Sequence, residues 1–456
     1  MLRRRFLRAT TGLAVFGLAI PAAYARKLSS VSQARIRGSL DAAELGVGPD
    51  RSDDQSIAFR AMLAEAARRD MPLFLPPGRY IVSDIALHSH LRITGVPGAT
   101  HIVQSGTSLF HGERLDRISL SGLVFDGGDI PLGDQADGLI DLKQASHLAI
   151  EDCSLRGSSK HGIALEAASG RIANSEISKA SGAGIHSIEG SGLDITHNRV
   201  TDCGNGGILV WRRKQADDRT AVSGNRIERI RADAGGTGQN GNGVNTFRAD
   251  NVIVSRNIIS ACAFSALRAN SCDNVQFAEN TCLGSGETAI YAEFSFEGAV
   301  INANIVDRAA NGISIVNFDK GGHLATCTGN LVRNLTSTGP YPAEGAGFGT
   351  GISVEADCTA SHNVIEGAPL FGMQIGWGPF MRDVVATGNV IRNAGVGIGV
   401  SVVEGTGRAV IADNVIDTAQ KGAIVGYRWS DPATGDLARG NSEKFPNLEI
   451  GRNSVG

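Results

Sequence analysis

A guanidinium, proton carriers and carboxyl groups recur in the sequence at matched positions, each two or four residues after a glycine or alanine. An arginine beside an amide can hold a carboxylate and neutralise its charge, and a tyrosine or histidine can then move a proton. The candidate catalytic residues in this pattern are Arg268, Tyr291, Glu293, Asn245, His186 and Glu355. Trp211 and Phe247, with their flat apolar faces, and Asn270 are the candidate substrate-binding residues.

Two reactions fit these residues. In β-elimination or epimerisation of a uronate, the arginine and asparagine would hold the carboxylate while Tyr291 or His186 moves the proton. In hydrolysis, Glu293 and Glu355 would act as a pair two repeats and thus about 9.6 Å apart, near the upper limit for inverting enzymes. Two alternatives stay open: an ordinary solvated face with a weak salt bridge, and a non-catalytic polysaccharide-binding or envelope-structural protein.

The elements that must position these residues are visible as a repeat. One half of the repeat reads Asn-x-apolar, at Asn198, Asn225, Asn257, Asn280, Asn304, Asn330, Asn363, Asn389 and Asn414. The other half reads Gly-apolar-x-apolar, at Gly162, Gly184, Gly207, Gly243, Gly312, Gly351, Gly372 and Gly397, with alanine at Ala266 and Ala289. A period of this size indicates a solenoid in which each repeat forms one coil.

Apolar and polar residues alternate within each half, so each coil carries short strands that point every second side chain into the core. Asparagine tolerates the left-handed conformation of a sharp corner and can bond to its neighbours up the stack, whereas glycine fits a corner too tight for a Cβ. Because parallel connections are right-handed, we predict an all-β fold, a right-handed parallel β-helix of about ten coils. Asn245, Arg268 and Tyr291 should then form one outward stripe, at about 4.8 Å per coil.

The two ends of such a stack must be covered, because an open core or sheet edge invites aggregation. Asp53-Asp54 precedes Gln55–Arg69, whose apolar stripe predicts an N-terminal capping α-helix. We therefore divide the chain into a signal segment (1–25), an entry segment with the capping helix (26–80), the β-helix (81–428) and a C-terminal cap or tail (429–456).

Residues 1–25 indicate an export address. Arg3-Arg4-Arg5-Phe6-Leu7-Arg8 is similar to a twin-arginine signal, an apolar run follows, and Ala23-Tyr24-Ala25 is a small-x-small cleavage site. The apolar run is too short to cross a bilayer, so we expect no membrane span in the mature form. The resemblance implies the twin-arginine export machinery as a partner and the periplasm or the cell exterior as the destination.

Composition excludes several classes of function. The net charge is −3 and the charges are well mixed, so we expect no nucleic-acid partner. The seven cysteines lack metal-ligand spacing and fit buried, reduced positions of the repeat. No dense aspartate cluster lines the stripe, so we expect no metal and no cofactor. Because Trp211 and Phe247 offer flat apolar faces of the kind that sugar rings pack on, we expect a polysaccharide or oligosaccharide substrate.

The segment before the first coils resembles the entry module of the pectate-lyase-like superfamily, on the residues Gly46-Val47-Gly48-Pro49-Asp50, Asp53-Asp54, Ala58-Phe59 and Leu75-Pro76-Pro77-Gly78-Arg79-Tyr80. With signal and coils, the chain also looks like a little-characterised family of twin-arginine-translocated repetitive proteins of bacteria. The superfamily includes polygalacturonases, alginate epimerases and lyases, and phage tailspikes, which implies a β-helix and an acidic or neutral polysaccharide. The catalytic motifs of polygalacturonases are missing, so the resemblance carries over no catalytic residue.

Overall fold

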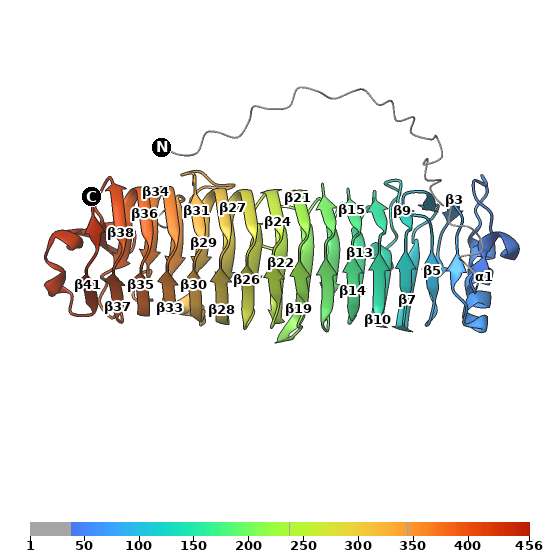
Figure 1. Ribbon diagram of the computed structural model, residues 1–456, viewed down its shortest axis with the longest axis horizontal. Helices are drawn as coiled ribbons and strands as arrows, with labels where there is room; N and C mark the ends of the chain where they lie inside the picture. The colour runs from blue at the N-terminus through green and yellow to red at the C-terminus, as the bar shows by residue number, and fades with distance from the viewer. Residues whose placement is uncertain (1–37, 237, 344, 346) are drawn as a thin grey trace, which may run out of the picture. The chain divides into compact units, whose positions relative to one another are not determined.

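The computed structural model describes residues 38–456 except 237, 344 and 346, so the expected signal segment lies outside the described residues. Residues Leu40–Gly456 form one compact unit, which Figure 1 shows as a stack of coils. Each full coil contributes strands to three ladders, here named A, B and C. All pairings within these ladders are parallel except that of the last two strands of ladder C. The prediction of an all-β, parallel β-helix is confirmed.

Ladder A has sixteen strands. They are β1 (Leu40–Asp41), β2 (Leu73–Phe74), β5 (Arg92–Thr94), β8 (Ser119–Ser121), β11 (Leu148–Glu151), β14 (Gly170–Ala173), β17 (Leu193–Thr196), β20 (Ala221–Ser223), β23 (Ile253–Ser255), β26 (Val275–Ala278), β28 (Glu297–Asn302), β30 (His323–Thr328), β33 (Ala356–Ser361), β35 (Arg382–Thr387), β37 (Ala409–Ala412) and β41 (Leu448–Gly451). The stack has about 14 turns rather than the ten expected, because the first coils lack the asparagine and glycine positions of the repeat.

Ladders B and C share several long strands that bend at the corner between them. Ladder B contains β3 (Gly78–Val82), β6 (Thr100–Gln104), β9 (Val124–Asp126), β12 (Ser154–Arg156), β15 (Glu176–Ser178), β18 (Arg199–Thr201), β21 (Arg226–Ile230), β24 (Ile258–Cys262), β27 (Thr281–Glu293), β29 (Ile305–Ile315), β31 (Leu331–Arg333), β34 (Val364–Ile375), β36 (Val390–Ser401), β38 (Val415–Ala419) and β42 (Ser454–Val455). Ladder C contains β4 (Ile85–Ala86), β7 (Phe110–Asp116), β10 (Gly138–Ser146), β13 (His161–Glu166), β16 (Ala183–Ile188), β19 (Gly206–Asp217), β22 (Asn242–Asp250), β25 (Leu267–Asn270), the ends of β27, β29, β34 and β36, β32 (Thr350–Val354), β39 (Ile424–Arg428) and β40 (Asp431–Asp436).

The corner between ladders A and B is held by a ladder of buried asparagines. Asn257 donates from its main-chain nitrogen and from Nδ2 to Oδ1 of Asn280, both at 3.0 Å, and the same pattern repeats along the stack. The left-handed conformation belongs to the residue before each asparagine, as at His197 (φ 56°) and Arg256 (φ 57°), and this corrects our expectation for the asparagine itself. The asparagine amide is thereby free to bond inside the corner.

The glycine half of the repeat lies at the corner between ladders B and C, where successive coils approach closely. A Cβ at Gly184 would lie 2.4 Å from Cγ1 of Val200 and 3.0 Å from the carbonyl oxygen of Gly207. Ile227 and Ile259 point into the core with no exposed surface, as the repeat predicted. The seven cysteines are likewise buried and free.

Both ends of the stack carry additional elements. The expected capping helix is α1 (Ser56–Arg69), and Oδ1 of Asp54 accepts a hydrogen bond from the main-chain nitrogen of Ser56 at 2.8 Å. Its Phe59 ring lies 6.0 Å from the ring of Phe110 in ladder C, so the helix packs on the first coils. Short 3-10 helices are η2 (Ala42–Leu45), η3 (Phe318–Lys320), η4 (Leu437–Arg439) and η5 (Ser442–Lys444). At the C-terminal end β40 folds back antiparallel on β39.

Candidate functional site

The outward rows of ladder C have the register that we expected from the sequence. The positions two residues after the opening glycine or alanine face one another in neighbouring coils, in the order His186, Leu209, Asn245, Arg268, Tyr291, Ser314, Ser353 and Gln374. The positions four residues after it do the same, in the order Ile188, Trp211, Phe247, Asn270 and Glu293. Residues between the two rows, such as Thr246 and Ala269, are fully buried.

Arg268 lies at the centre of an ion-pair network on these rows. Its Nε and Nη2 atoms donate to the two carboxylate oxygens of Glu293, at 2.7 and 3.0 Å. Its Nη1 atom donates to Oε2 of Glu287 at 3.1 Å, and the guanidinium lies 5.0 Å from the centroid of the Tyr291 ring. Asn270 donates from Nδ2 to Oε1 of Glu293 at 3.1 Å. The guanidinium of Arg268 thus contacts two carboxyl groups and one aromatic ring.

Two loops at the corner between ladders B and C extend over this network. In the loop before β22, the carbonyl oxygen of Gly238 accepts a hydrogen bond from Nδ2 of Asn245 at 3.2 Å. In the loop before β32, the hydroxyl of Tyr341 donates to Oε1 of Glu287 at 2.5 Å, and its ring stacks on Phe264 with centroids 6.3 Å apart. The loops are the insertions that make these two coils long, and they bury a surface that would otherwise face solvent.

Burial decides what the charged groups of the network can do. The side chains of Arg268, Glu287 and Glu293 keep 8%, 4% and 3% of their surface exposed. Because Glu293 pairs with the guanidinium through both oxygens, Arg268 has little charge left to offer a substrate carboxylate. Burial raises the pKa of Glu287, and it raises the pKa of Tyr291 well above the ordinary value, so this tyrosine keeps its proton. The network therefore favours a carboxylic acid as proton donor over a phenolate as proton acceptor.

In the preceding coils the same face carries an aromatic stack. His186 lies between His161 and Trp211, with ring centroids 4.5 and 5.0 Å away, and Trp211 lies 6.2 Å from Phe247. The main-chain nitrogen of Ala183 donates to Nδ1 of His161, whose Nε2 is 3.1 Å from Nδ1 of His186. Burial, with a contribution from His161, lowers the pKa of His186 to about 3, so His186 is neutral at physiological pH. The rings therefore pack against one another on the outer side of the wall and stay half-buried.

Glu355 follows β32, two coils beyond Glu293, as counted from the sequence. Its Oε2 atom accepts a hydrogen bond of 2.7 Å from the main-chain nitrogen of Phe318, the first residue of η3. Burial raises the pKa of Glu355 to about 7. The two carboxyl groups expected to act as a hydrolytic pair are thus held by different partners, Glu293 by an arginine and Glu355 by a helix end.

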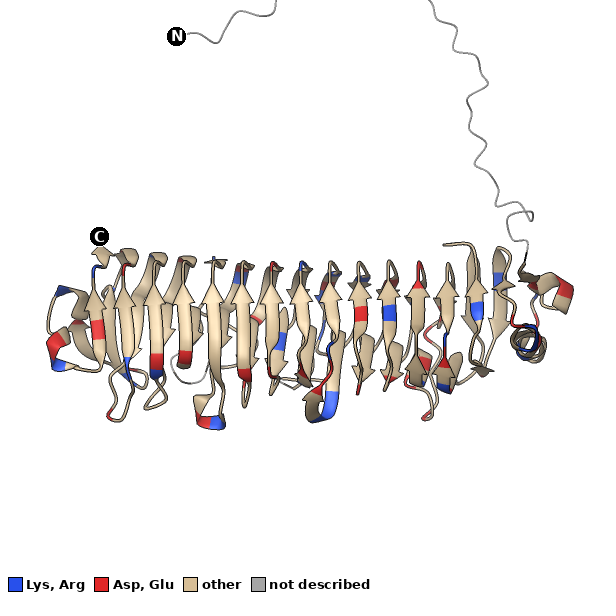
Figure 2. Ribbon diagram, turned by 60° about the horizontal axis from the view of Figure 1, so that its bottom comes forward, with Lys and Arg blue, Asp and Glu red and all other residues tan. Residues whose placement is uncertain are grey.

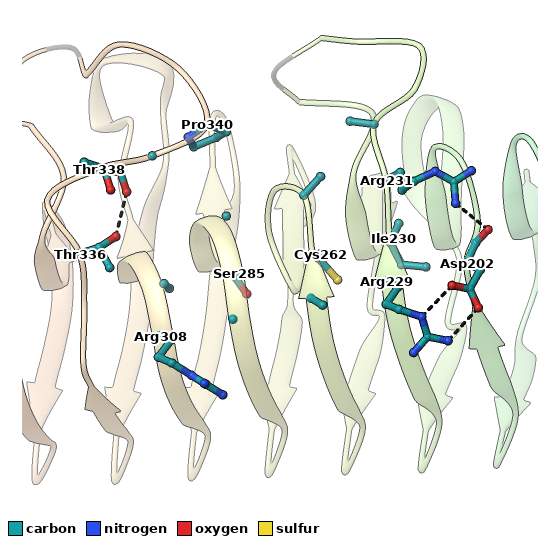
Figure 3. Close-up of a pocket in the computed structure, with 17 residues that line it drawn as sticks. Asp202, Arg229, Ile230, Arg231, Cys262, Ser285, Arg308, Thr336, Thr338 and Pro340 are labelled. Carbon is teal, nitrogen blue, oxygen red and sulfur yellow. Dashed lines mark hydrogen bonds and ion pairs between the residues drawn. The ribbon is translucent and has the colours of Figure 1, made fainter.

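Beside the buried network a groove of about 840 Å³ lies on the outer side of ladder B, between the two loops (Figure 3). Its floor is main chain and small side chains, at Ala261, Ala263, Gly284, Ser285 and Gly286. Its charged and hydroxyl-bearing lining residues are Asp202, Arg229, Arg231, Arg308, Thr336 and Thr338. The site expected from the sequence lies on ladder C and includes none of the residues that line this groove.

The charges of the groove are unevenly paired. Arg229 donates from Nε and Nη2 to the two carboxylate oxygens of Asp202, both at 2.7 Å. The side chain of Arg308 is 70% exposed, and its contact with Asp307 is 3.9 Å long. Asp307 also accepts two shorter hydrogen bonds from Arg333, at 3.1 and 2.9 Å. Arg308 therefore presents much of its charge to solvent at the groove.

The groove and the buried network meet at one wall. Gly286 and Pro340 line the groove, and the next residues along the chain are Glu287 and Tyr341, which share the 2.5 Å hydrogen bond. A carboxyl group with a raised pKa thus lies at the boundary between the groove and the ion-pair network. Within the described part of the chain, no group of three or more His, Cys, Asp or Glu residues is arranged to hold a metal ion.

None of the described helices is long and apolar enough to cross a membrane.

Comparison with known protein families agrees with the architecture. The family model of the right-handed β-helix region matches residues 138–328 and 215–380, which together cover more than half of the chain. The chain belongs to this right-handed β-helix family. No curated protein matches its sequence.

Solved structures with a similar fold include gene product 12 of bacteriophage Phi29. Its N-terminal fragment has 16% sequence identity and a TM-score of 0.52, over 91% of this β-helix chain and 70% of the phage chain. The pre-mature form has 14% identity and a TM-score of 0.56, over 87% of this chain and 56% of the phage chain. At these identities the similarity concerns the fold of the β-helix.

Sequence reasoning missed Glu287 and Tyr341. The register was counted from the glycine or alanine that opens each strand of ladder C, and Glu287 lies two residues before Ala289, in the corner. Tyr341 lies in a loop that lengthens its coil, but nothing in its spacing indicates a contact with a residue 54 positions earlier. The greater length of these two coils was the one feature of the sequence that could have indicated the contact, since long loops beside one face tend to cover it.

Proposed function

We propose that this β-helix protein is an exported, carbohydrate-active protein that binds an acidic polysaccharide in the groove of ladder B. The observation that carries the proposal is the charge of the groove. Its lining contains three arginines and one aspartate, in a chain whose net charge is −3. Arg229 pairs with Asp202 and Arg231 with Asp233, so Arg308, 3.9 Å from Asp307, is the arginine that stays largely unpaired. An uncompensated cation above a floor of main chain and small residues suits a carboxylated sugar chain lying across the coils.

The dimensions of the groove support an extended ligand. The lining runs from β18, which precedes Asp202, to β29, which contains Arg308, and these strands are four coils apart. At about 4.8 Å per coil the groove is about 19 Å long, enough for several sugar rings in line. Thr336 and Thr338 add hydroxyl groups at the far end.

We further propose hydrolysis as the reaction, with Glu287 as the proton donor. A general acid needs a pKa near the working pH, and burial moves the pKa of Glu287 upward in this direction. Elimination is less suited, because Arg268 is paired with Glu293 through two hydrogen bonds. The products would be reducing ends without an unsaturated sugar.

A second candidate is a protein that binds polysaccharide without turning it over. The observation that favours it is the burial of Glu287 and Glu293, whose side chains keep 4% and 3% exposure. A structural ion-pair network also perturbs pKa values. Binding at Arg308 with no turnover of any polysaccharide would support this candidate.

The test is a screen of the purified protein against acidic and neutral polysaccharides, reading bound sugar, reducing ends and ultraviolet absorbance. Arg308→Gln should weaken binding of the acidic ligand several-fold, and Arg114→Gln, an exposed arginine far from the groove, should not. Glu287→Gln should lower turnover at least about a hundredfold, as loss of a general acid does, while Glu366→Gln on the outside of ladder B leaves it unchanged. Equal binding of neutral and acidic chains by wild type would reject the proposal.

Export by the twin-arginine route to the periplasm or beyond is also part of the proposal, and it rests on Arg3, Arg4 and the small residues that end at Ala25. Lysine at both arginine positions should leave the precursor in the cytoplasm. Cell fractionation with an antibody to the β-helix measures this. Normal export of the double variant would mean that another route is used.

A further inference from the structure

The outer face of ladder A is uncharged over eight successive coils. Each strand from β20 to β37 points two central side chains outward, and the pairing register aligns them in two rows. The first row runs from Ala221 and Ile253 through Gln276, Val300, Thr326 and Thr359 to Val385 and Val410. The second row runs from Ser223 to Ala412 and contains only Ser, Ala, Asn and Thr.

This uncharged face is open to solvent. Ile253 and Val300 keep 41% and 39% of their surface exposed, and Thr326 and Thr359 are exposed as well. In Figure 2 the strands of ladder A form the row of arrows that faces the viewer, and the middle of the row is tan. The outward positions of ladder B over the same coils differ, since they include Glu228, Asp307, Arg333, Glu366, Arg392 and Asp417.

We propose that this face of ladder A binds the same face of a second copy of the chain. Contiguous exposed apolar surface is rare on proteins that stay monomeric, and this face carries Ile253, Val300, Val385 and Val410 among small and hydroxyl side chains. Flat sheet faces bury such surface by packing on one another. The face is about 38 Å long and about 13 Å wide, so two copies would bury about 1,000 Å², the lower limit for a specific interface. The proposal is independent of the function proposed for the groove.

A second copy matches the face in spacing. Its side chains repeat at the same interval of about 4.8 Å, so the two rows of one copy can interdigitate with the two rows of the other. A hollow of about 410 Å³ lies on this face and is lined by Val300, Leu324, Thr326 and Thr359, and also by Asp357 and Asp383. These two aspartates lie outside the two uncharged rows and are paired with Arg382 and Arg408. With a two-fold axis at Val300, the pairing sets Ile253 of one copy opposite Thr359 of the other, above this hollow.

The charged residues at the two ends of the face favour the same arrangement. Beyond its N-terminal limit the outward row carries Asp194 and then Arg171, and beyond its C-terminal limit it carries Glu449. In an antiparallel pair with the axis at Val300, Arg171 of each copy lies opposite Glu449 of the other. A shift of the axis by half a coil would instead bring Asp194 opposite Glu449, and these two carboxylates would repel each other. Arg171 also pairs with Glu151 within its own chain, at 2.6 Å.

Sedimentation of the full chain tests the association. Wild type should have twice the mass of one chain at micromolar concentration, and Val300→Glu should shift the protein to monomer by burying two like charges at the axis. Val364→Glu is the matched control, because Val364 is 43% exposed on ladder B and lies outside the face. A monomeric wild type, or equal dissociation by the two variants, would overturn the proposal. Circular dichroism confirms that each variant keeps the β-helix.

Cross-linking tests the position of the axis without depending on a charged variant. Val300→Cys should give a covalent dimer with a short bismaleimide, since the two-fold places the two residues opposite one another. Ile305→Cys, which is 40% exposed on ladder B, should not, and the native cysteines are buried and should stay unreacted. Arg171→Glu should weaken the dimer about tenfold, and adding Glu449→Arg should restore it. Cross-linking through residue 305 instead of 300 would place the interface on another face and reject the proposal.

Discussion

Replacing Glu355 by glutamine should stabilise the fold at pH 8 and leave its stability almost unchanged at pH 4. The residue keeps 7% exposure, and its carboxylate accepts a hydrogen bond from the main-chain nitrogen of Phe318 at 2.7 Å. Burial outweighs that bond and raises the pKa from the ordinary 4.5 to about 7. At about 1.4 kcal/mol per pKa unit, the ionised carboxyl costs the folded state about 3 kcal/mol.

The sign follows from where the proton is held. In the unfolded chain this carboxyl releases its proton near pH 4.5, whereas the folded protein keeps it up to about pH 7. Folding therefore takes up a proton between these values, and stability falls as the pH rises through this window. Glutamine is uncharged at every pH, and its amide oxygen can still accept the bond from Phe318. The gain of Glu355→Gln should thus appear between pH 4.5 and 7 and be constant above.

Urea denaturation of wild type and Glu355→Gln at pH 4, 6 and 8 measures the effect. Glu366→Gln serves as the control, because Glu366 is exposed and its replacement should leave the pH dependence unchanged. Parallel stability curves for wild type and Glu355→Gln would refute the reasoning. The same variant also tests the hydrolytic pair expected from the sequence: lost turnover at unchanged stability would assign Glu355 a catalytic role rather than the anchoring of η3.

Three further variants test the packing of the wall and the corners. Arg268→Leu leaves Glu287 and Glu293 buried without a counter-charge and should lower the unfolding free energy at pH 7 by about 3 to 5 kcal/mol, with a smaller loss at acid pH; an equal loss at both pH values would count against it. Asn280→Ala interrupts the asparagine ladder on both sides and should cost at least about 2 kcal/mol, measured by urea denaturation; a neutral result would mean that the ladder adds little stability. Cys203→Ala should cost about 1 kcal/mol through lost burial and leave polysaccharide binding intact, whereas altered binding at unchanged stability would assign the thiol a function.

The repeat made the wall of the β-helix predictable. A strand alternates its side chains strictly, so one glycine or alanine per coil sets which residues face outward and which neighbour they meet. The pairings of Asn245 with Arg268 and of Arg268 with Tyr291 follow from that count alone. The corner was predicted less well, because the asparagine pattern marks the turn but not which of its residues adopts the positive φ.

The amino-acid sequence by itself therefore determined the coil, its register and the residues on each face. Each of these depends on the alternation of side chains along a strand and on the alignment of equivalent repeat positions in neighbouring coils. The tertiary structure decided which outward residues stay in solvent. Two loops that lie outside the repeat place Gly238 and Tyr341 over the outer face of ladder C. The row of side chains that the sequence predicts to be open to solvent is therefore a buried network. The groove beside it depends on the same loops, and the pKa of Glu287 depends on the burial that they cause. Contacts between a loop and residues tens of positions away leave no periodic trace in a sequence, and only the folded chain reveals them.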